Sequence, residues 1–225
     1  MTSDKRPYRS DLRAEQARRT RWQIVTAAGE LFAQRGYAAT TIDAVAERAR
    51  VSRKTVFTAV GGKPVLIKLA YDWAAVGDDE EIPLVERERV QRMRREADPV
   101  RLMEAYSRHF TEVVVRVAPL YLALRNAADA DEEARDLFAE VQAERMRGMR
   151  MLAEQLARIG GLRPGLSVRR ANDLLFFHID PAHYELLVLT RGWSISAFRQ
   201  WFLSSLKLHL LGLAEEAATP ARAGS

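Results

Sequence analysis

Positive side chains lie where two short helices of this sequence are expected to begin. Ser52 is a predicted N-cap, and Arg53 and Lys54 fill the first turn after it. Gly62 is the next predicted cap, and Lys63 follows it directly. Cations at the positive end of a helix dipole are unfavourable unless an anion is present. Backbone N–H groups at such ends favour anionic oxygens, so both starts are predicted to bind phosphate groups of a nucleic acid.

The exposed face between these two helix starts is predicted to lie against base edges. Arg53 and Lys54 can donate to O6 and N7 of guanine, and Thr58 or Phe57 can contact a thymine methyl group. The simpler interpretation of the two cations is a solvated helix start without a specific partner.

Catalytic and metal-binding patterns are weak in this chain. Cysteine is absent, which excludes disulfides and thiolate metal sites. His178, Asp180 and His183 could converge on a metal if Pro181 bends their helix, but core or surface histidines are the simpler interpretation. Gly61-Gly62-Lys63 lacks the earlier glycine and the preceding strand of a P-loop. We predict that the protein is not an enzyme and needs no metal or cofactor.

Positive charge is concentrated at the N-terminal end. The chain has 225 residues and a formal net charge of +5, with +7 over residues 1–63 and −2 over the remainder. This asymmetry indicates a polyanion partner for the N-terminal segment, although a solvated basic arm would look the same. No apolar run resembles a signal peptide or a membrane span, so we predict a cytoplasmic protein without membrane contact.

Apolar residues recur at helical spacing throughout, and alternating strand patterns are missing, so the predicted fold class is all-α. The predicted helices span residues 20–35, 40–49, 52–59, 64–77, 100–117, 119–128, 131–159, 167–190 and 194–217. Gly36 is expected to end the first helix, and Thr40 and Asp43 to cap the second. Two short helices joined by a tight corner and backed by a third form a helix-turn-helix. Pro119 and Pro181 are expected to kink or break helices.

The last two predicted helices are apolar nearly all round. Such helices must bury more than one side, which favours a self-complementary interface between two copies of the chain. A ligand pocket is sought among residues of mixed character on the central helices, although each is more often an ordinary core residue. The candidates are Met103, Tyr106, His109, Phe110, Tyr121, Arg125, Asn126, Phe177 and His178.

The run from Thr20 to about Leu69 resembles the DNA-binding domain of TetR-type repressors, through LFAQRGYAATTIDAVAERA, VSRKTVF and the following Lys63. PAHYELLVLTRGWSISAFRQWFLSSL is similar to the last two helices of many actinobacterial members. The resemblance implies an all-helical homodimer that binds a palindromic operator on double-stranded DNA through its first three helices. It further implies a repressor that a small-molecule effector releases.

The resemblance also assigns roles to individual residues. The implied phosphate contacts are Thr41, Thr55, Phe57 and Lys63. The implied base contacts are Arg53, Lys54 and Thr58, beside the cap residue Ser52. Arg50 stands where the family usually has glycine, so it must adopt a left-handed conformation or reshape the corner. Phe57 replaces the usual tyrosine and lacks the hydroxyl that binds phosphate.

The predicted organisation has four parts: a mobile basic arm over residues 1–19, a helix-turn-helix DNA-binding domain over 20–63, a helical-bundle effector-binding and dimerisation domain over 64–217, and a disordered tail over 218–225. The predicted function is sequence-specific DNA binding in transcription regulation. The alternative is a helical small-molecule binding or interaction protein without sequence-specific DNA binding, which Arg50 and Phe57 leave open.

Overall fold

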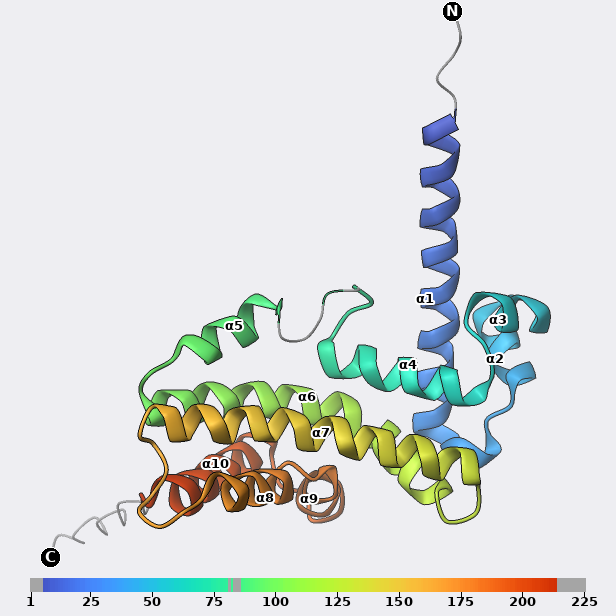
Figure 1. The fold of residues 1–225 in the computed structure, drawn as a ribbon. Coiled ribbons are helices and arrows are strands. Elements are labelled where there is room, and N and C mark those ends of the chain that lie inside the picture. The colour runs from blue at the N-terminus through green and yellow to red at the C-terminus, as the bar shows by residue number, and fades with distance from the viewer. Residues whose placement is uncertain (1–5, 81, 83–85, 214–225) are drawn as a thin grey trace, which may run out of the picture. The chain divides into compact units, whose positions relative to one another are not determined.

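The computed structural model describes residues 6–80, 82 and 86–213, with side chains from residue 12 onward. Every regular element within these ranges is helical, which confirms the all-α prediction (Figure 1). The elements are α1 Arg6–Ala39, α2 Ile42–Ala49, α3 Arg53–Ala59, α4 Lys63–Val76, α5 Glu88–Arg95, α6 Pro99–Ala127, α7 Glu132–Arg158, α8 Val168–His178, α9 Pro181–Tyr184, the π-helical η2 Glu185–Thr190, α10 Ile195–Leu206 and the π-helical η3 Lys207–Leu211.

Helix α1 begins much earlier than the predicted start at Thr20. The prediction followed buried apolar spacing, and residues 12–19 are exposed and carry no such pattern. Gly36 interrupts the helix with φ 77° and ψ 173°, as its sequence position indicated, and one more turn follows to Ala39. Residues 1–5 and 218–225 of the predicted arm and tail lie outside the described residues, and the four domain limits remain predictions.

The two prolines behave differently. Helix α6 continues through Pro119, so the predicted break between residues 117 and 119 is wrong. Buried Ala118 and Leu120 on either side of the proline pack the helix firmly enough to offset the lost hydrogen bond. Pro181 begins α9, and Asp180 caps it by accepting a 2.9 Å hydrogen bond from the Ala182 N–H. The predicted helix over 167–190 is therefore divided into α8, α9 and η2.

The last predicted helix is shorter than expected. Helix α10 extends to Leu206, and the π-helical η3 follows directly. Gly212, in the left-handed conformation with φ 75°, ends η3. Its predicted last residues, 214–217, lie outside the described residues. No helix in the described part of the chain is long and apolar enough to cross a bilayer.

The chain divides into two compact units. The first unit comprises residues 1–82 and 113–143, and the second comprises residues 83–112 and 144–225. Helices α6 and α7 are both divided between the units, so that each helix has one part in the first unit and one part in the second.

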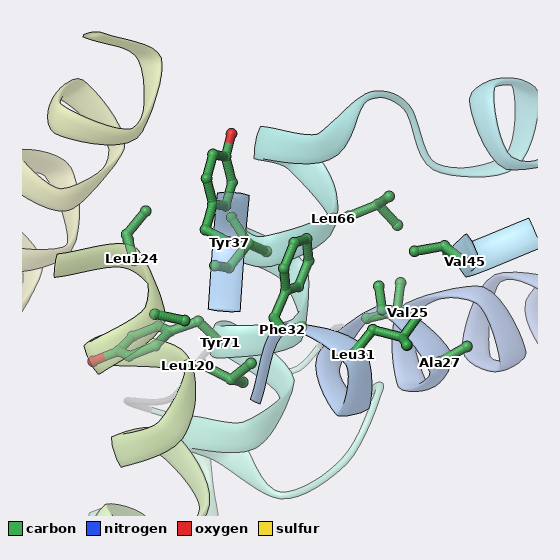
Figure 2. Close-up of a cluster of buried hydrophobic side chains, with 14 of the residues drawn as sticks. Val25, Ala27, Leu31, Phe32, Tyr37, Val45, Leu66, Tyr71, Leu120 and Leu124 are labelled. Carbon is green, nitrogen blue, oxygen red and sulfur yellow. The ribbon is translucent and has the colours of Figure 1, made fainter. Parts of the chain in front are cut away.

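The core of the first unit forms where α1 packs against α2, α3 and α4. Figure 2 shows Phe32 of α1 near Leu66 of α4, in a cluster that also includes Val45 of α2. Tyr37, which follows Gly36, folds back onto Phe32 with ring centroids 5.8 Å apart. Because these side chains are almost completely buried, they fix the directions in which α2 and α3 present their outer faces.

Two arginines of the first unit hold the C-terminal end of α4 and the segment that follows it. Arg116 of α6 donates from Nε to the Ala74 carbonyl oxygen at 2.7 Å. Arg18 of α1 binds the Asp79 carboxylate through two hydrogen bonds of 2.9 and 2.8 Å. The hydrogen bond from Arg18 is the main cause that lowers the pKa of Asp79. Helix α4 is therefore attached to both α1 and α6.

The second unit has an aromatic core. Phe110 of α6 lies 4.5 Å from Phe202 of α10 between ring centroids, and Phe198 stacks near Phe202 at 6.5 Å. Gln155 of α7 is buried and donates to the carbonyl oxygens of Met93 and Glu96 at 2.8 and 3.2 Å. These bonds hold the end of α5 against α7.

Candidate DNA-binding surface

The corner between α2 and α3 is tight and depends on one strained residue. Arg50 has φ 57° and ψ 42°, and among the described residues it is the one non-glycine residue with positive φ. Its N–H donates to the Glu47 carbonyl oxygen at 3.1 Å, and the Val51 N–H donates to Ala46 at 2.9 Å. Of the two outcomes expected for Arg50, the left-handed conformation is the observed one, and the corner keeps its hydrogen bonds.

Side-chain caps fix the starts of both helices. Thr41, not the predicted Thr40, caps α2 by accepting a 3.1 Å hydrogen bond from the Ala44 N–H. Thr40 is buried instead and donates to the Gly36 carbonyl oxygen at 2.8 Å, so the prediction was wrong by one residue. Ser52 caps α3 as predicted, by accepting a 3.0 Å hydrogen bond from the Thr55 N–H.

The outer face of α3 makes little contribution to the protein core. Val56 is completely buried and holds the helix in place, whereas Val51 and Val60 are half-buried and pack against the same core. The outward residues are Arg53, Lys54, Phe57 and Thr58. Phe57 is 46% exposed, which is high for a large apolar side chain.

Arg53 is paired within the protein. Its Nη1 donates to Oδ2 of Asp43 on α2 at 2.7 Å, and its Cζ lies 5.6 Å from the centroid of the Phe57 ring. Sequence reasoning missed this pair because it treated Asp43 only as a cap of α2. The available signal was an exposed carboxylate on α2 and an exposed cation on α3, separated by one tight corner.

Lys63 also has a partner within the first unit. Its ammonium group lies 4.1 Å from the centroid of the Tyr37 ring and donates to the Ala38 carbonyl oxygen at 3.3 Å. Partial burial lowers the pKa of Lys63, and the charge of Asp131 opposes this change. Burial, aided by Asp131 and Glu133, raises the pKa of Tyr37 to about 12. Lys63 therefore lies against the last turn of α1 in this structure.

The eight predicted DNA-binding residues all belong to the first unit. Ser52 and Thr55 share a hydrogen bond between their hydroxyl groups of 2.7 Å. The Thr58 hydroxyl donates back to the Lys54 carbonyl oxygen at 3.0 Å. Thr41 is exposed at the start of α2. The surface thus combines fixed hydroxyl groups with an aromatic ring and three cations.

The nine predicted effector residues fall into both units. Tyr121, Arg125 and Asn126 lie in the first unit, and the other six lie in the second. In the second unit, the rings of Tyr106 and Phe110 stack at 6.5 Å. A cavity of about 1220 Å³ lies elsewhere, within the first unit, and none of the nine residues lines it. The walls of this cavity come from α1, the end of α3, α4 and the segment after α4. Sequence reasoning did not single out these segments as a ligand pocket.

The two histidines of the metal alternative, His178 and His183, make other contacts in the structure. Nε2 of His178 lies 2.9 Å from Nδ1 of His209, within hydrogen-bonding distance. His183 contacts the Phe177 ring edge-on at 4.9 Å between ring centroids. Within the described residues, no group of three histidine or acidic side chains is placed to hold a metal ion.

Comparisons with known proteins agree with this geometry. Residues 24–67 match the family model described as bacterial regulatory proteins, tetR family. NalD, the secondary repressor of the MexAB-OprM multidrug efflux pump in Pseudomonas aeruginosa, is 20% identical over 88% of this chain and 98% of its own, with a TM-score of 0.67. The transcriptional regulator FadR from Bacillus subtilis in complex with stearoyl-CoA is 20% identical over 85% and 98%, with a TM-score of 0.66.

A third solved structure has the same fold. The fatty acid degradation regulator FadR from Bacillus halodurans is 16% identical over 83% of this chain and 93% of its own, with a TM-score of 0.65. A comparison with curated proteins gives no match. The matched residues contain α2, α3 and the corner between them, so the resemblance of the run from Thr20 to about Leu69 is confirmed. The resemblance of the last two helices stays a prediction.

Proposed function

We propose that this chain, a TetR-type transcriptional regulator by its DNA-binding domain and fold, is a homodimeric repressor that a small-molecule effector releases from a palindromic operator. One observation carries the proposal: α3 is held by a buried valine and presents cations and an aromatic ring to solvent, inside the domain that matches the family. The proposed site of action is the cytoplasm, and the proposal includes no catalytic step.

The proposed contacts divide into two groups. Thr41, Thr55, Phe57 and Lys63 contact phosphate or sugar and set the position of the domain on the duplex. Arg53, Lys54 and Thr58 contact base edges in the major groove. Because Phe57 has no hydroxyl, its proposed contact is apolar. Ser52 supports both groups through its bonds to Thr55.

The proposed dimer interface lies on the second unit. Large apolar side chains are exposed there on consecutive elements from α8 to η3, and they agree with the sequence prediction of helices that are apolar on several sides. They are Phe177, Leu186, Leu189, Trp193, Ile195 and Leu208. A two-fold pair of such surfaces would bury both sets at once and place two α3 helices for two half-sites.

Effector binding is proposed to act through α4. This helix is joined to α6 by Arg116 and carries Lys63 at its other end. A ligand that binds one position of α4 better than another would change operator affinity. The FadR structure is a complex with stearoyl-CoA, and NalD is a repressor. These similar structures support ligand-controlled repression without identifying the effector of this chain.

Selection of DNA from a random pool tests the proposal. We expect the full chain to enrich a palindromic sequence and to bind it with an affinity that falls steeply as salt rises. Arg53→Ala should relax the preference at one base pair and cost about 1 to 3 kcal/mol, whereas Lys63→Ala should weaken all sequences alike and flatten the salt dependence. Equal competition by selected and random DNA would favour the alternative of a helical binding protein without sequence specificity.

A further inference from the structure

We propose that Asp43 is a positioning residue for base recognition, because it holds the guanidinium of Arg53 from one side while the Phe57 ring lies on another. The carboxylate of Asp43 accepts the 2.7 Å hydrogen bond from Nη1, and the ring centroid is 5.6 Å from Cζ. The inference rests on the proposed function, in which Arg53 reads a base. Asp43 therefore increases the preference of Arg53 for that base over the other bases.

The hydrogen bond to Asp43 leaves enough donors for DNA. A guanidinium has five N–H groups, and the bond to Asp43 uses one of them. Recognition of guanine O6 and N7 needs two donors. Arg53 can therefore bind guanine while Asp43 remains bound, and the pair does not have to separate first.

Asp43 is a firm anchor because α2 itself is fixed. Thr41 caps the helix, and Val45 and Ala46, which follow Asp43 in the same helix, are buried. Free Arg53 would sample many rotamers and lose that freedom on binding DNA. If Asp43 restricts these rotamers before binding, the entropy lost on binding DNA is smaller. This gain applies only to the orientation of Arg53 that Asp43 holds.

Stability alone does not account for the pair. The side chains of Arg53 and Asp43 are 58% and 69% exposed, and ion pairs this exposed contribute little to folding. The Asp43 carboxylate is exposed beside Arg53, and its negative charge would repel a phosphate that came close to it in a complex where Arg53 does not contact its base. Repulsion of this kind raises specificity by weakening non-specific complexes.

The experiment compares Asp43→Asn with Glu30→Gln in the full chain, by selection from a random DNA pool followed by titration. Glu30 of α1 accepts a 2.7 Å hydrogen bond from Nε of Arg48, so its variant removes one exposed, paired carboxylate of the same unit. Both variants change the net charge equally. We expect Asp43→Asn to reduce the ratio of specific to random DNA affinity about tenfold, and Glu30→Gln to leave the base preference unchanged.

The position of the effect distinguishes orientation from direct reading. Asp43→Asn should relax the same base pair as Arg53→Ala, and should change the preference less than about twofold when Arg53 is already alanine. Relaxation at a different base pair would mean that Asp43 contacts DNA itself, and would overturn the inference. Asp43→Ser, which suits the first turn of α2, should reproduce the effect if asparagine disturbs folding.

The outcomes also separate this inference from the proposed function. If the wild-type chain selects no sequence, the proposed function fails and the inference fails with it. If the wild type selects an operator and Asp43→Asn keeps the same preference as Glu30→Gln, the inference alone is overturned.

Discussion

Protonation of His178 is expected to destabilise the second unit as pH falls. The side chain is only 3% exposed, and its Nε2 lies 2.9 Å from Nδ1 of His209. Burial, followed by the charges of His209 and His183, lowers the pKa of His178 to about 4. The nearest ring from α10 is Trp201, which contributes no charge.

The sign and size of the effect follow from the difference between folded and unfolded states. The ordinary pKa of histidine is 6.5, so between pH 6.5 and about 4 the unfolded chain binds a proton that folded His178 does not. The free energy of unfolding is therefore unaffected above pH 6.5 and decreases as pH falls toward 4. The depression of the pKa corresponds to a loss of up to about 3 kcal/mol at the acid end.

Urea unfolding of the wild type and His178→Gln between pH 7.5 and 4.5 measures this loss. Glutamine keeps a polar group near His209 but cannot be protonated, so the stability of the variant should fall less steeply between pH 6.5 and 4.5. Protein concentration must be held constant because the proposed dimerisation would also change apparent stability. If the two curves remain parallel over this range, His178 does not carry the pH dependence.

Two further predictions concern backbone positions. Gly161→Ala should lower the free energy of unfolding by about 1 to 3 kcal/mol, because a Cβ there would lie 2.7 Å from Cβ of Pro99. In the matched variant Gly148→Ala, the new Cβ meets no atom within 4 Å. This variant should raise the free energy of unfolding by about 1 kcal/mol, because alanine favours a helix more than glycine does. Equal shifts of the melting temperature in the two variants would contradict the clash at Gly161. Arg50→Gly should raise the stability of the first unit in urea by up to about 1 kcal/mol by relieving left-handed strain, and a loss would show that Arg50 is not strained.

Local signals in the sequence predicted the helix-turn-helix well. Ser52 as a cap and Gly36 as an interruption depend on neighbours within one or two turns of the chain. The start of α1 could not be found in the same way, because an exposed charged segment has no buried face to create a pattern. The break expected at Pro119 failed because tertiary packing outweighs a local preference.

Side-chain partners across helices were not accessible from spacing. The pairing of Arg53 with Asp43 and the position of Lys63 over Tyr37 depend on how three helices cross. The effector candidates show the same limit on a larger scale. Tyr106 and Tyr121 share the apolar pattern of α6, yet they belong to different units, which the pattern does not separate.

The hydrogen bond from Arg116 holds the last turn of α4, so we expect this end of the helix to be the fixed point if α4 tilts. Helix α4 has 14 residues, so it is about 20 Å long, and a tilt of about 10° would carry Lys63 about 3.5 Å sideways. That is close to the rise of one base pair, about 3.4 Å. A small tilt of α4 would therefore be enough to displace Lys63 from its proposed phosphate contact.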